Sequence, residues 1–225
     1  MTASDISAAL ADECDRILNR LDETPKTRQA ARASPDSPGI YTIWSADPAG
    51  LRDLELENKP GETPLMGRPL YVGKATDSTL VRLDKHFDPG DTGHSTARRT
   101  LASLLDLESR PRRTTIEHPT PKQLQTLVSN FDLTESADGV LSRWMKENLL
   151  VCAAASTFTP LRDLERAVGA VLRPPLDQDR PPMWTPNPWR PQVSEARGRL
   201  RDRARVAASN LFPSLSPEDE RGEML

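Results

Sequence analysis

The chain has 225 residues, of which 36% are apolar and 28% charged, and its net charge is −3. This length suffices for one ordinary core. Because 21 prolines are more than a helical bundle tolerates, we expect a compact domain interrupted by long irregular connections. The slightly negative charge excludes a generic binder of polyanions, so any contacts to nucleic acid would have to come from local basic patches.

The cysteine content and the absence of targeting segments indicate where in the cell the protein is expected. Two distant cysteines, Cys14 and Cys152, together with only three histidines, form neither a disulfide framework nor a zinc site. The first ten residues lack the basic start and the apolar run of a secretory signal, and no segment reaches the length of a membrane span. We therefore expect a soluble, cytoplasmic protein without a membrane partner.

The first third of the chain alternates between periodic and polar segments. Residues 4–21 predict an amphipathic helix, and a polar connector ending in proline and glycine follows. Residues 39–44, GIYTIW, predict a strand. Residues 46–69 form a long polar insertion, and such a length between two strands is typical of a functional or a flexible loop.

The remaining elements are organised around residues 70–87, LYVGKATDSTLVRLDKHF. Leu70 to Val72 predict a strand, and Gly73 frees the backbone after it from the steric limits of a Cβ. Asp77, Ser78 and Thr79 are candidates to cap a following helix. On that helix Arg82 and His86 are four residues apart, so a fixed cation and a titratable base share one face. This arrangement predicts a phosphate site.

Further helices are predicted after this stretch. The first of them has Arg98 and Arg99 on its outward side, and a short strand is possible at residues 114–116. A second strand is predicted at residues 150–155. The predicted helices span residues 95–107, 121–128, 141–149, 161–172 and 194–208.

Taken in order, GIY at 39–41, YVGKA at 71–75, an Arg and a His four apart and a Glu on a distant helix resemble the GIY-YIG nuclease superfamily. The resemblance runs from about residue 38 to residue 177 and is greatest to the nuclease domain of excision-repair endonucleases and to some restriction enzymes. It implies an α/β fold with a small, mostly antiparallel three-stranded sheet flanked by helices, with helical extensions at both ends.

We expect three parts on this basis. An N-terminal helix and linker would occupy residues 1–37, and the nuclease domain residues 38–180. A loop rich in proline and tryptophan, an arginine-rich helix and an acidic tail would occupy residues 181–225.

The resemblance also implies cleavage of a DNA phosphodiester with one divalent ion, Mg²⁺ or Mn²⁺. Tyr41 would orient or deprotonate the attacking water, with Lys74 and His86 tuning or relaying the proton. Tyr71 would position the site, and Arg82 would hold the charge that builds up on phosphorus. Each residue also has a structural alternative: the tyrosines could close a small sheet, and Lys74 and Arg82 could be solvated.

Glu165 is the metal ligand that the resemblance implies. It falls at the edge of the apolar arc of its predicted helix, where a partly shielded carboxylate favours a metal or a cation as its partner. The alternative is a structural salt bridge to an arginine. Many family members have an asparagine in the context where this chain has RPPLD, which places Asp177 there. Aspartate loses the amide donor and adds a charge, so it could add a metal ligand or lower activity.

DNA contacts are expected from basic residues in three segments, Arg98 and Arg99, Arg112 and Arg113, and the terminal helix with Arg197 and Arg201. The arginines of that helix recur every second residue and do not form one stripe, so DNA contact and a solvated face stay equally open. Two other functions remain possible, a DNA-binding module with weakened catalysis and a sequence-specific restriction or phage-defence enzyme. In the latter, residues 46–69 and the terminal helix would recognise the DNA sequence.

Overall fold

The computed structural model describes residues 3–22, 25–31, 36–90, 92–178 and 182–213. The chain divides into two compact units, each built from two chain segments: unit 1 from residues 1–88 and 142–192, and unit 2 from residues 89–141 and 193–225. The units do not end at residues 37 and 180, between which we expected the nuclease domain. One reason is that the N-terminal helix shares a core with the central sheet.

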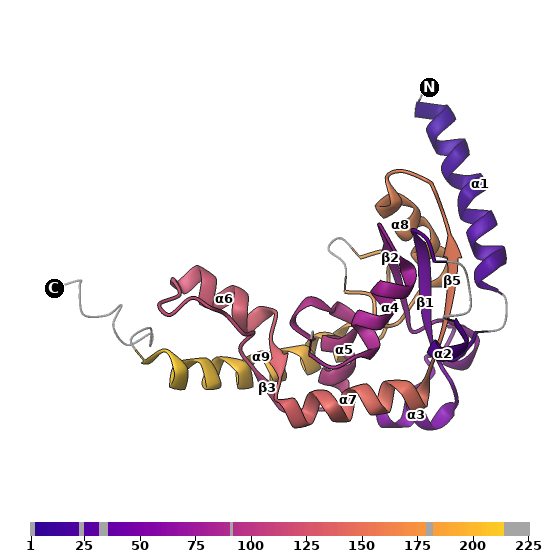
Figure 1. Cartoon of the computed structure of the whole chain (residues 1–225). Coiled ribbons are helices and arrows are strands. Elements are labelled where there is room, and N and C mark those ends of the chain that lie inside the picture. Colours follow the sequence, from indigo (N-terminus) through magenta and orange to yellow (C-terminus); the bar gives the residue numbers. More distant parts are fainter. Residues whose placement is uncertain (1–2, 23–24, 32–35, 91, 179–181, 214–225) are drawn as a thin grey trace. The chain divides into compact units, whose positions relative to one another are not determined.

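Unit 1 contains the three-stranded sheet and the helices α1 and α8 (Figure 1). Its elements are α1 (Ala3–Leu21), α2 (Arg28–Ala31), β1 (Gly39–Ser45), α3 (Pro48–Asp53), the 3₁₀ helix η1 (Leu65–Gly67), β2 (Tyr71–Ala75), α4 (Thr79–Phe87), β5 (Leu149–Ala155) and α8 (Leu161–Leu172).

Unit 2 has shorter elements: η2 (Thr92–His94), α5 (Thr96–Leu104), β3 (Ser109–Arg110), α6 (Pro121–Ser129) and β4 (Asp132–Leu133). Two helices, α7 (Glu135–Asn148) and α9 (Arg190–Leu211), pass through the unit boundaries. The expected strand at residues 114–116 is wrong, because β4 pairs instead with residues 109–110. Helix α7 begins six residues before residue 141, the predicted start of this helix.

The sheet of unit 1 has the order β2-β1-β5, and both pairings are antiparallel. This confirms the predicted three-stranded antiparallel sheet. Strand β1 is central, so six of its seven residues are buried, as expected for a strand covered on both faces. Gly39 is needed at its start, because a Cβ there would lie 2.1 Å from the carbonyl oxygen of Ala154 on β5.

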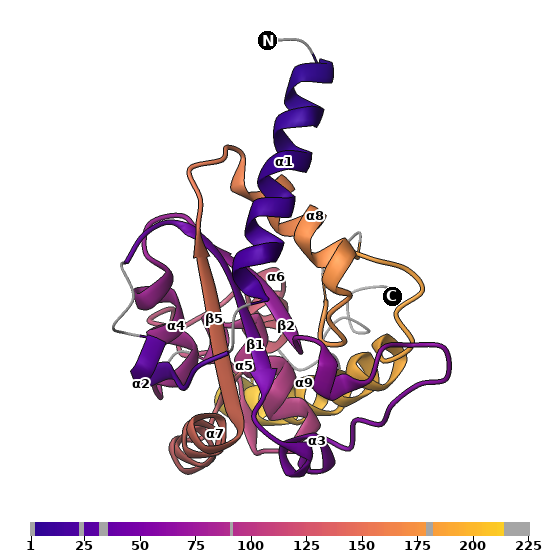
Figure 2. The ribbon, with the colours of Figure 1, turned by 90° about the vertical axis from the view of Figure 1, so that its right-hand side faces the viewer.

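Helices α1 and α8 pack against each other and against the sheet, and Figure 2 shows them side by side. Their shared core includes Ile17 of α1, Ile40 of β1, Val72 of β2 and Leu164 of α8, all at most 1% exposed. Because side chains alternate along a strand, Tyr41 and Tyr71 point to the opposite face, where α4 lies. The sheet therefore separates an apolar core from a polar cluster.

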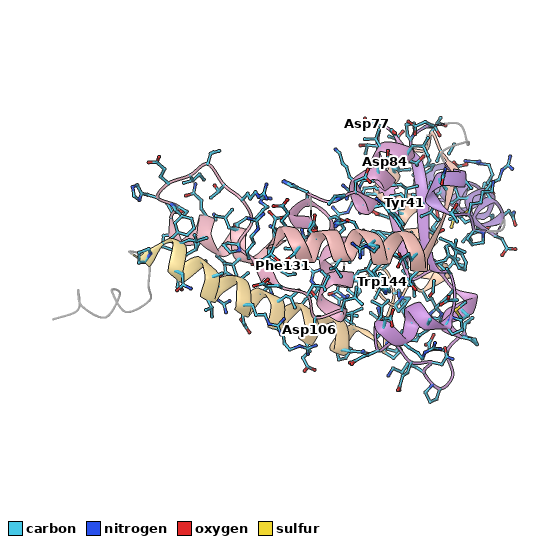
Figure 3. The ribbon with its side chains drawn as sticks, turned by 60° about the horizontal axis from the view of Figure 1, so that its bottom comes forward. Tyr41, Asp77, Asp84, Asp106, Phe131 and Trp144 are labelled. Carbon is cyan, nitrogen blue, oxygen red and sulfur yellow. The ribbon has the colours of Figure 1, made fainter. Side chains whose placement is uncertain are left out.

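The long insertion between β1 and β2 is packed, although the sequence suggested a polar loop. It contains α3, whose N-terminus is capped by Asp47, and η1. Four of its leucines are buried: Leu51, Leu54, Leu56 and Leu65. Trp144 of α7, labelled in Figure 3, donates a hydrogen bond of 2.8 Å to Asp53 at the end of α3. The insertion is thus an ordered part of unit 1.

Arg98 and Arg99 do not face outward, and this prediction is wrong. Arg98 is fully buried, and its guanidinium donates to Asp138 at 2.7 Å and to Thr92 at 2.9 Å. Arg99 is 7% exposed and donates to the carbonyl oxygen of Gly93. Burial raises the pKa of Asp138, but the hydrogen bonds from Thr92 and Arg98 outweigh it and leave this pKa below its ordinary value. Both arginines stabilise unit 2, so we withdraw them as DNA contacts.

Helix α9 buries a stripe of small and apolar residues at a spacing of three and four: Val193, Ala196, Leu200, Ala204 and Ala208. The arginines lie between these positions. The helix is polar overall, and no helix in the described parts of the chain is long and apolar enough to cross a membrane.

Candidate active site

The side chain of Tyr41, on the central strand β1, extends over the edge strand β2, because the residue paired with it there is a glycine. The register of the two strands places Tyr41 opposite Gly73. A Cβ on Gly73 would lie 2.4 Å from the Tyr41 hydroxyl oxygen and 2.9 Å from the ring of Tyr71. Gly73 has no left-handed backbone that would require a glycine. The glycine of YVG therefore provides space for the tyrosine of GIY, a role that differs from the backbone freedom expected from the sequence.

Helix α4 presents His86 to this tyrosine. The helix begins at the N-cap Ser78, whose hydroxyl accepts a 2.8 Å hydrogen bond from the amide of Val81. Leu83 and Phe87 are buried and fix the rotation of the helix. His86, also fully buried, lies with its Nε2 atom 2.5 Å from the Tyr41 hydroxyl oxygen. Figure 3 shows Tyr41 on β1 and labels Asp84 on α4.

Arg82 and Tyr71 bind the same phenol, and both hydrogen bonds lower its pKa. Burial has the larger effect, because Tyr41 is only 1% exposed, and it raises the pKa of Tyr41 to about 12. The charge of Arg82 opposes this shift and the charge of Glu165 adds to it. The phenol is therefore neutral at physiological pH.

Two of the contacts of the phenol have a defined direction. A guanidinium only donates, and a hydrogen bond from Tyr71 lowers the pKa of Tyr41 because it stabilises the phenolate. The Tyr41 oxygen is thus an acceptor for both residues. In the 2.5 Å contact with His86 Nε2, the tautomer of the imidazole sets which atom donates.

Glu165 lies on α8 and is 7% exposed. Its Oε2 atom forms an ion pair of 2.5 Å with the Lys74 ammonium, whose side chain is 31% exposed. Lys74 is therefore not a solvated lysine at the end of a strand, and it contacts the carboxylate. Because side chains alternate along β2, Lys74 lies on the same face as Val72, where α8 packs. The charge of Glu165 nevertheless acts on the Tyr41 phenol.

The structure joins four of the six predicted catalytic residues, Tyr41, Tyr71, Arg82 and His86, and pairs the other two, Lys74 and Glu165. These residues supply a neutral phenol in contact with an imidazole, a permanent cation and a carboxylate. Such a set can move a proton and hold an anionic oxygen. No group of three or more His, Cys, Asp or Glu side chains suited to a metal was found in the described part of the chain.

Comparison with known families shows the family to which the chain belongs. The model of the GIY-YIG catalytic domain matches residues 39–199, which is most of the chain. The chain belongs to the GIY-YIG family. Neither the curated proteins nor the solved structures contain a match to it. The GIY-YIG domain here is a nuclease-type catalytic domain, and its sheet is the one that the motif predicts.

Asp177 of this GIY-YIG domain is 2% exposed and has structural contacts. Its carboxylate accepts a 2.8 Å hydrogen bond from the amide of Met183 and lies 3.9 Å from the guanidinium of Arg190. The adjacent Leu176 donates to the carbonyl of Leu70, just before β2. A role of Asp177 in the reaction stays a prediction, and the contacts found are those of a residue that organises a loop.

The other arginines expected at the DNA differ in exposure. Arg113 is exposed, whereas the half-buried Arg112 packs its aliphatic part over Gly93. On α9, Arg197 donates to the hydroxyl of Thr100, and Arg201 donates to the carbonyl of Arg197. The more exposed arginines of α9 pair with acids: Arg199 with Glu195, Arg203 with Asp106 and Arg205 with Asp202. DNA binding by Arg112, Arg113, Arg197 and Arg201 remains a prediction.

Proposed function

We propose that the protein is a metal-dependent endonuclease that hydrolyses DNA phosphodiester bonds with one divalent ion. The observation that supports this proposal most is the environment of the Tyr41 oxygen. It accepts from Arg82 and Tyr71, contacts His86 at 2.5 Å and lies within the electrostatic reach of Glu165. Membership of the GIY-YIG family supports a nuclease independently of this geometry.

The proposed proton path uses the hydrogen bond between Tyr41 and His86. The attacking water takes the place of the Tyr71 hydroxyl at the Tyr41 oxygen, so that one lone pair of this oxygen faces the water. The water oxygen attacks phosphorus while the water proton passes to that lone pair and the phenolic hydrogen passes to an unprotonated His86 Nε2. The bond from phosphorus to the leaving oxygen breaks, and that oxygen takes a proton from solvent. Because the phenol gives up one proton as it receives another, its pKa of about 12 does not oppose the step.

Tyr71 and Arg82 would connect this path to the substrate. Both are half-buried, whereas Tyr41 is almost fully covered. The Tyr71 hydroxyl donates to the Tyr41 oxygen in the structure, and once the water has displaced it there it would position that water. A guanidinium has five N–H donors, so Arg82 can bond the Tyr41 oxygen and also an oxygen of the phosphoryl group, where negative charge develops.

Glu165 would hold the divalent ion, and its chemistry fits that task. Mg²⁺ prefers oxygen ligands and is usually bound by one or two carboxylates, with water and phosphate oxygens at the other positions. When bound, the ion would neutralise phosphoryl charge and acidify a coordinated water. Lys74 balances the charge of the Glu165 carboxylate at a distance of 2.5 Å and would orient it.

A plasmid-nicking assay with Mg²⁺ or Mn²⁺ tests the proposal. We expect the wild type to convert supercoiled plasmid to nicked or linear forms, and chelation to abolish this conversion. Arg82→Ala and Glu165→Ala should each lower the rate about 10²- to 10³-fold, because each removes stabilisation of the transition state. Arg143→Ala and Glu147→Ala, at exposed positions of α7, are matched controls that should leave the rate unchanged.

The same assay separates the alternative functions. A DNA-binding module without efficient catalysis would retard DNA in a gel but would not nick it with either ion. A restriction or phage-defence enzyme would produce discrete bands from a long substrate, whereas a repair-type nuclease would require a distorted or damaged site. A wild type that neither nicks nor binds DNA would contradict the proposed function.

A further inference from the structure

A cavity of unit 1 is lined by Lys74, the residue that forms the ion pair with Glu165. It has a volume of about 500 Å³, within the range of pockets that hold small organic ligands. Its walls are mostly apolar and come from three chain segments. They include Pro38 before β1, Lys74 and Thr76 on and after β2, and residues 156–162, which connect β5 to α8. Neither the proposed proton path nor the proposed metal position uses this cavity.

Two residues join the cavity to the catalytic site. Lys74 lines the cavity and also forms the 2.5 Å ion pair with Glu165. Arg162 lines it too and lies three residues before Glu165 on α8, so the two side chains share a face of that helix. A substrate group bound between Arg82 and Glu165 would therefore have this cavity next to it.

We propose that the cavity holds one unstacked nucleobase of the DNA, from the nucleotide that flanks the phosphodiester to be cut. This inference rests on the proposed function. The apolar walls suit a flat heterocycle, and Phe158 at the cavity offers an aromatic ring for stacking. The cations at its border, Lys74 and Arg162, suit the phosphates on either side of such a nucleotide.

The polar atoms of the cavity agree with this occupant. Three threonines, Thr76, Thr157 and Thr159, line it and carry hydroxyls that can donate to or accept from the edge of a base. A base inside a regular duplex cannot enter such a pocket unless it leaves the stack. The preferred substrate is therefore single-stranded DNA or a duplex whose base at the cut is unpaired or easily opened.

Abasic scanning tests the proposal without requiring cleavage. Tyr41→Phe protein is titrated with fluorescent single-stranded octanucleotides in which a tetrahydrofuran abasic residue replaces each nucleotide in turn, and binding is followed by anisotropy. Because stacking of one base on an aromatic side chain contributes about 1–3 kcal/mol, we expect one position at which removing the base weakens binding about 5- to 150-fold. Removing other bases should have smaller effects.

A matched pair of variants tests whether the base at that position of the oligonucleotide binds in the cavity. Phe158→Leu keeps an apolar side chain against the core but removes the ring, so it should abolish the penalty at that position. Phe212→Leu, at a half-buried phenylalanine just after α9, should leave the penalty intact. Thermal melting of both variants checks that they are folded.

The result that overturns the proposal is an abasic penalty that is equal at all positions, or one that Phe158→Leu leaves unchanged. If the wild type nicks plasmid and either result is found, the base pocket is wrong and the proposed function stands. If the wild type neither nicks nor binds DNA, both proposals fail.

Discussion

Each unit of the molecule contains a buried polar network, and the two networks differ in what surrounds them. In unit 2, Arg98 is fully buried and its guanidinium bonds Thr92 and the carboxylate of Asp138. In unit 1, the buried Tyr41 bonds the buried His86 and the half-buried Tyr71 and Arg82. The first network neutralises its charges internally and serves the fold. The second has a neutral phenol at its centre and includes the half-buried cation Arg82, which suits a site that receives an anion.

The largest loss of stability should follow from breaking the polar network of unit 2. Asp138→Ala leaves the buried Arg98 guanidinium without its carboxylate, which typically costs about 3–5 kcal/mol of unfolding free energy. Chemical denaturation followed by circular dichroism measures this loss. Asp163→Ala, at an exposed carboxylate of α8, is the control and should change stability little. Equal losses for the two variants would show that the Arg98 network does not stabilise the fold.

The next effect concerns the buried phenol of unit 1. The pKa of Tyr41 is raised from 10 to about 12, so the unfolded chain ionises this residue at lower pH than the folded one. The resulting contribution to stability is complete below pH 10 and is lost as the pH rises towards 12. It amounts to about 2.7 kcal/mol for a shift of two pKa units.

The measurement compares the wild type with Tyr41→Phe. Unfolding free energies are determined at pH 9 to 12. Other titrating groups contribute equally to both proteins, so their contribution drops out of the difference between the two unfolding free energies. We expect the advantage of the wild type to shrink across this range. A constant difference would show that the pKa of Tyr41 is not raised.

A smaller effect tests the space beside Tyr41. Gly73→Ala places a Cβ where the Tyr41 hydroxyl lies, so the ring must move, at a cost of about 1–3 kcal/mol for an overpacked site. Because the hydroxyl then loses its contact with His86, nicking activity should fall to that of Tyr41→Phe. Gly67→Ala is the control, since its nearest neighbour would be 3.6 Å from the new Cβ. Full activity of Gly73→Ala would refute the packing argument.

The smallest effect tests how α4 is held. Ser78→Ala removes the side-chain cap on the amide of Val81 and should lower stability by about 1 kcal/mol. Thermal unfolding measures it. Ser78→Thr keeps a hydroxyl that can cap Val81 and donate to the Asp36 carboxylate, so it should retain most of the stability. Equal losses in the two variants would exclude these hydrogen bonds as the cause.

The sequence allowed the sheet and the family to be predicted, because these depend on local strand patterns and on a motif with fixed residue types. The catalytic role of the six residues named from that motif stays a prediction. Gly39, Tyr41, Tyr71 and Gly73 are all in the motif, but their contacts depend on the pairing register, which no local pattern shows. Antiparallel pairing alone does not place Gly73 opposite Tyr41, since this also requires the register in which Gly39 pairs with Ala75.

Arg98 and Arg99 show where sequence reasoning fails. Helical periodicity predicted an outward arginine pair, yet Asp138 is 40 residues away from Arg98 and brings its carboxylate to it only in the folded unit. Arginine is seldom fully buried unless it is paired, so the pattern alone favoured the surface. Likewise, the buried leucines of residues 46–69 are scattered among polar residues and give no regular period.

The order of segments in unit 1 has a consequence for protein synthesis. Tyr41 and Arg82 lie in its first segment, whereas β5 and Glu165 lie in its second, after more than fifty residues that belong to unit 2. Strand β1 cannot acquire its second neighbour on a ribosome until that later segment has emerged. A nascent or prematurely terminated chain that stops before α8 would lack the Glu165 carboxylate, so most of the chain must be translated before the proposed site is complete.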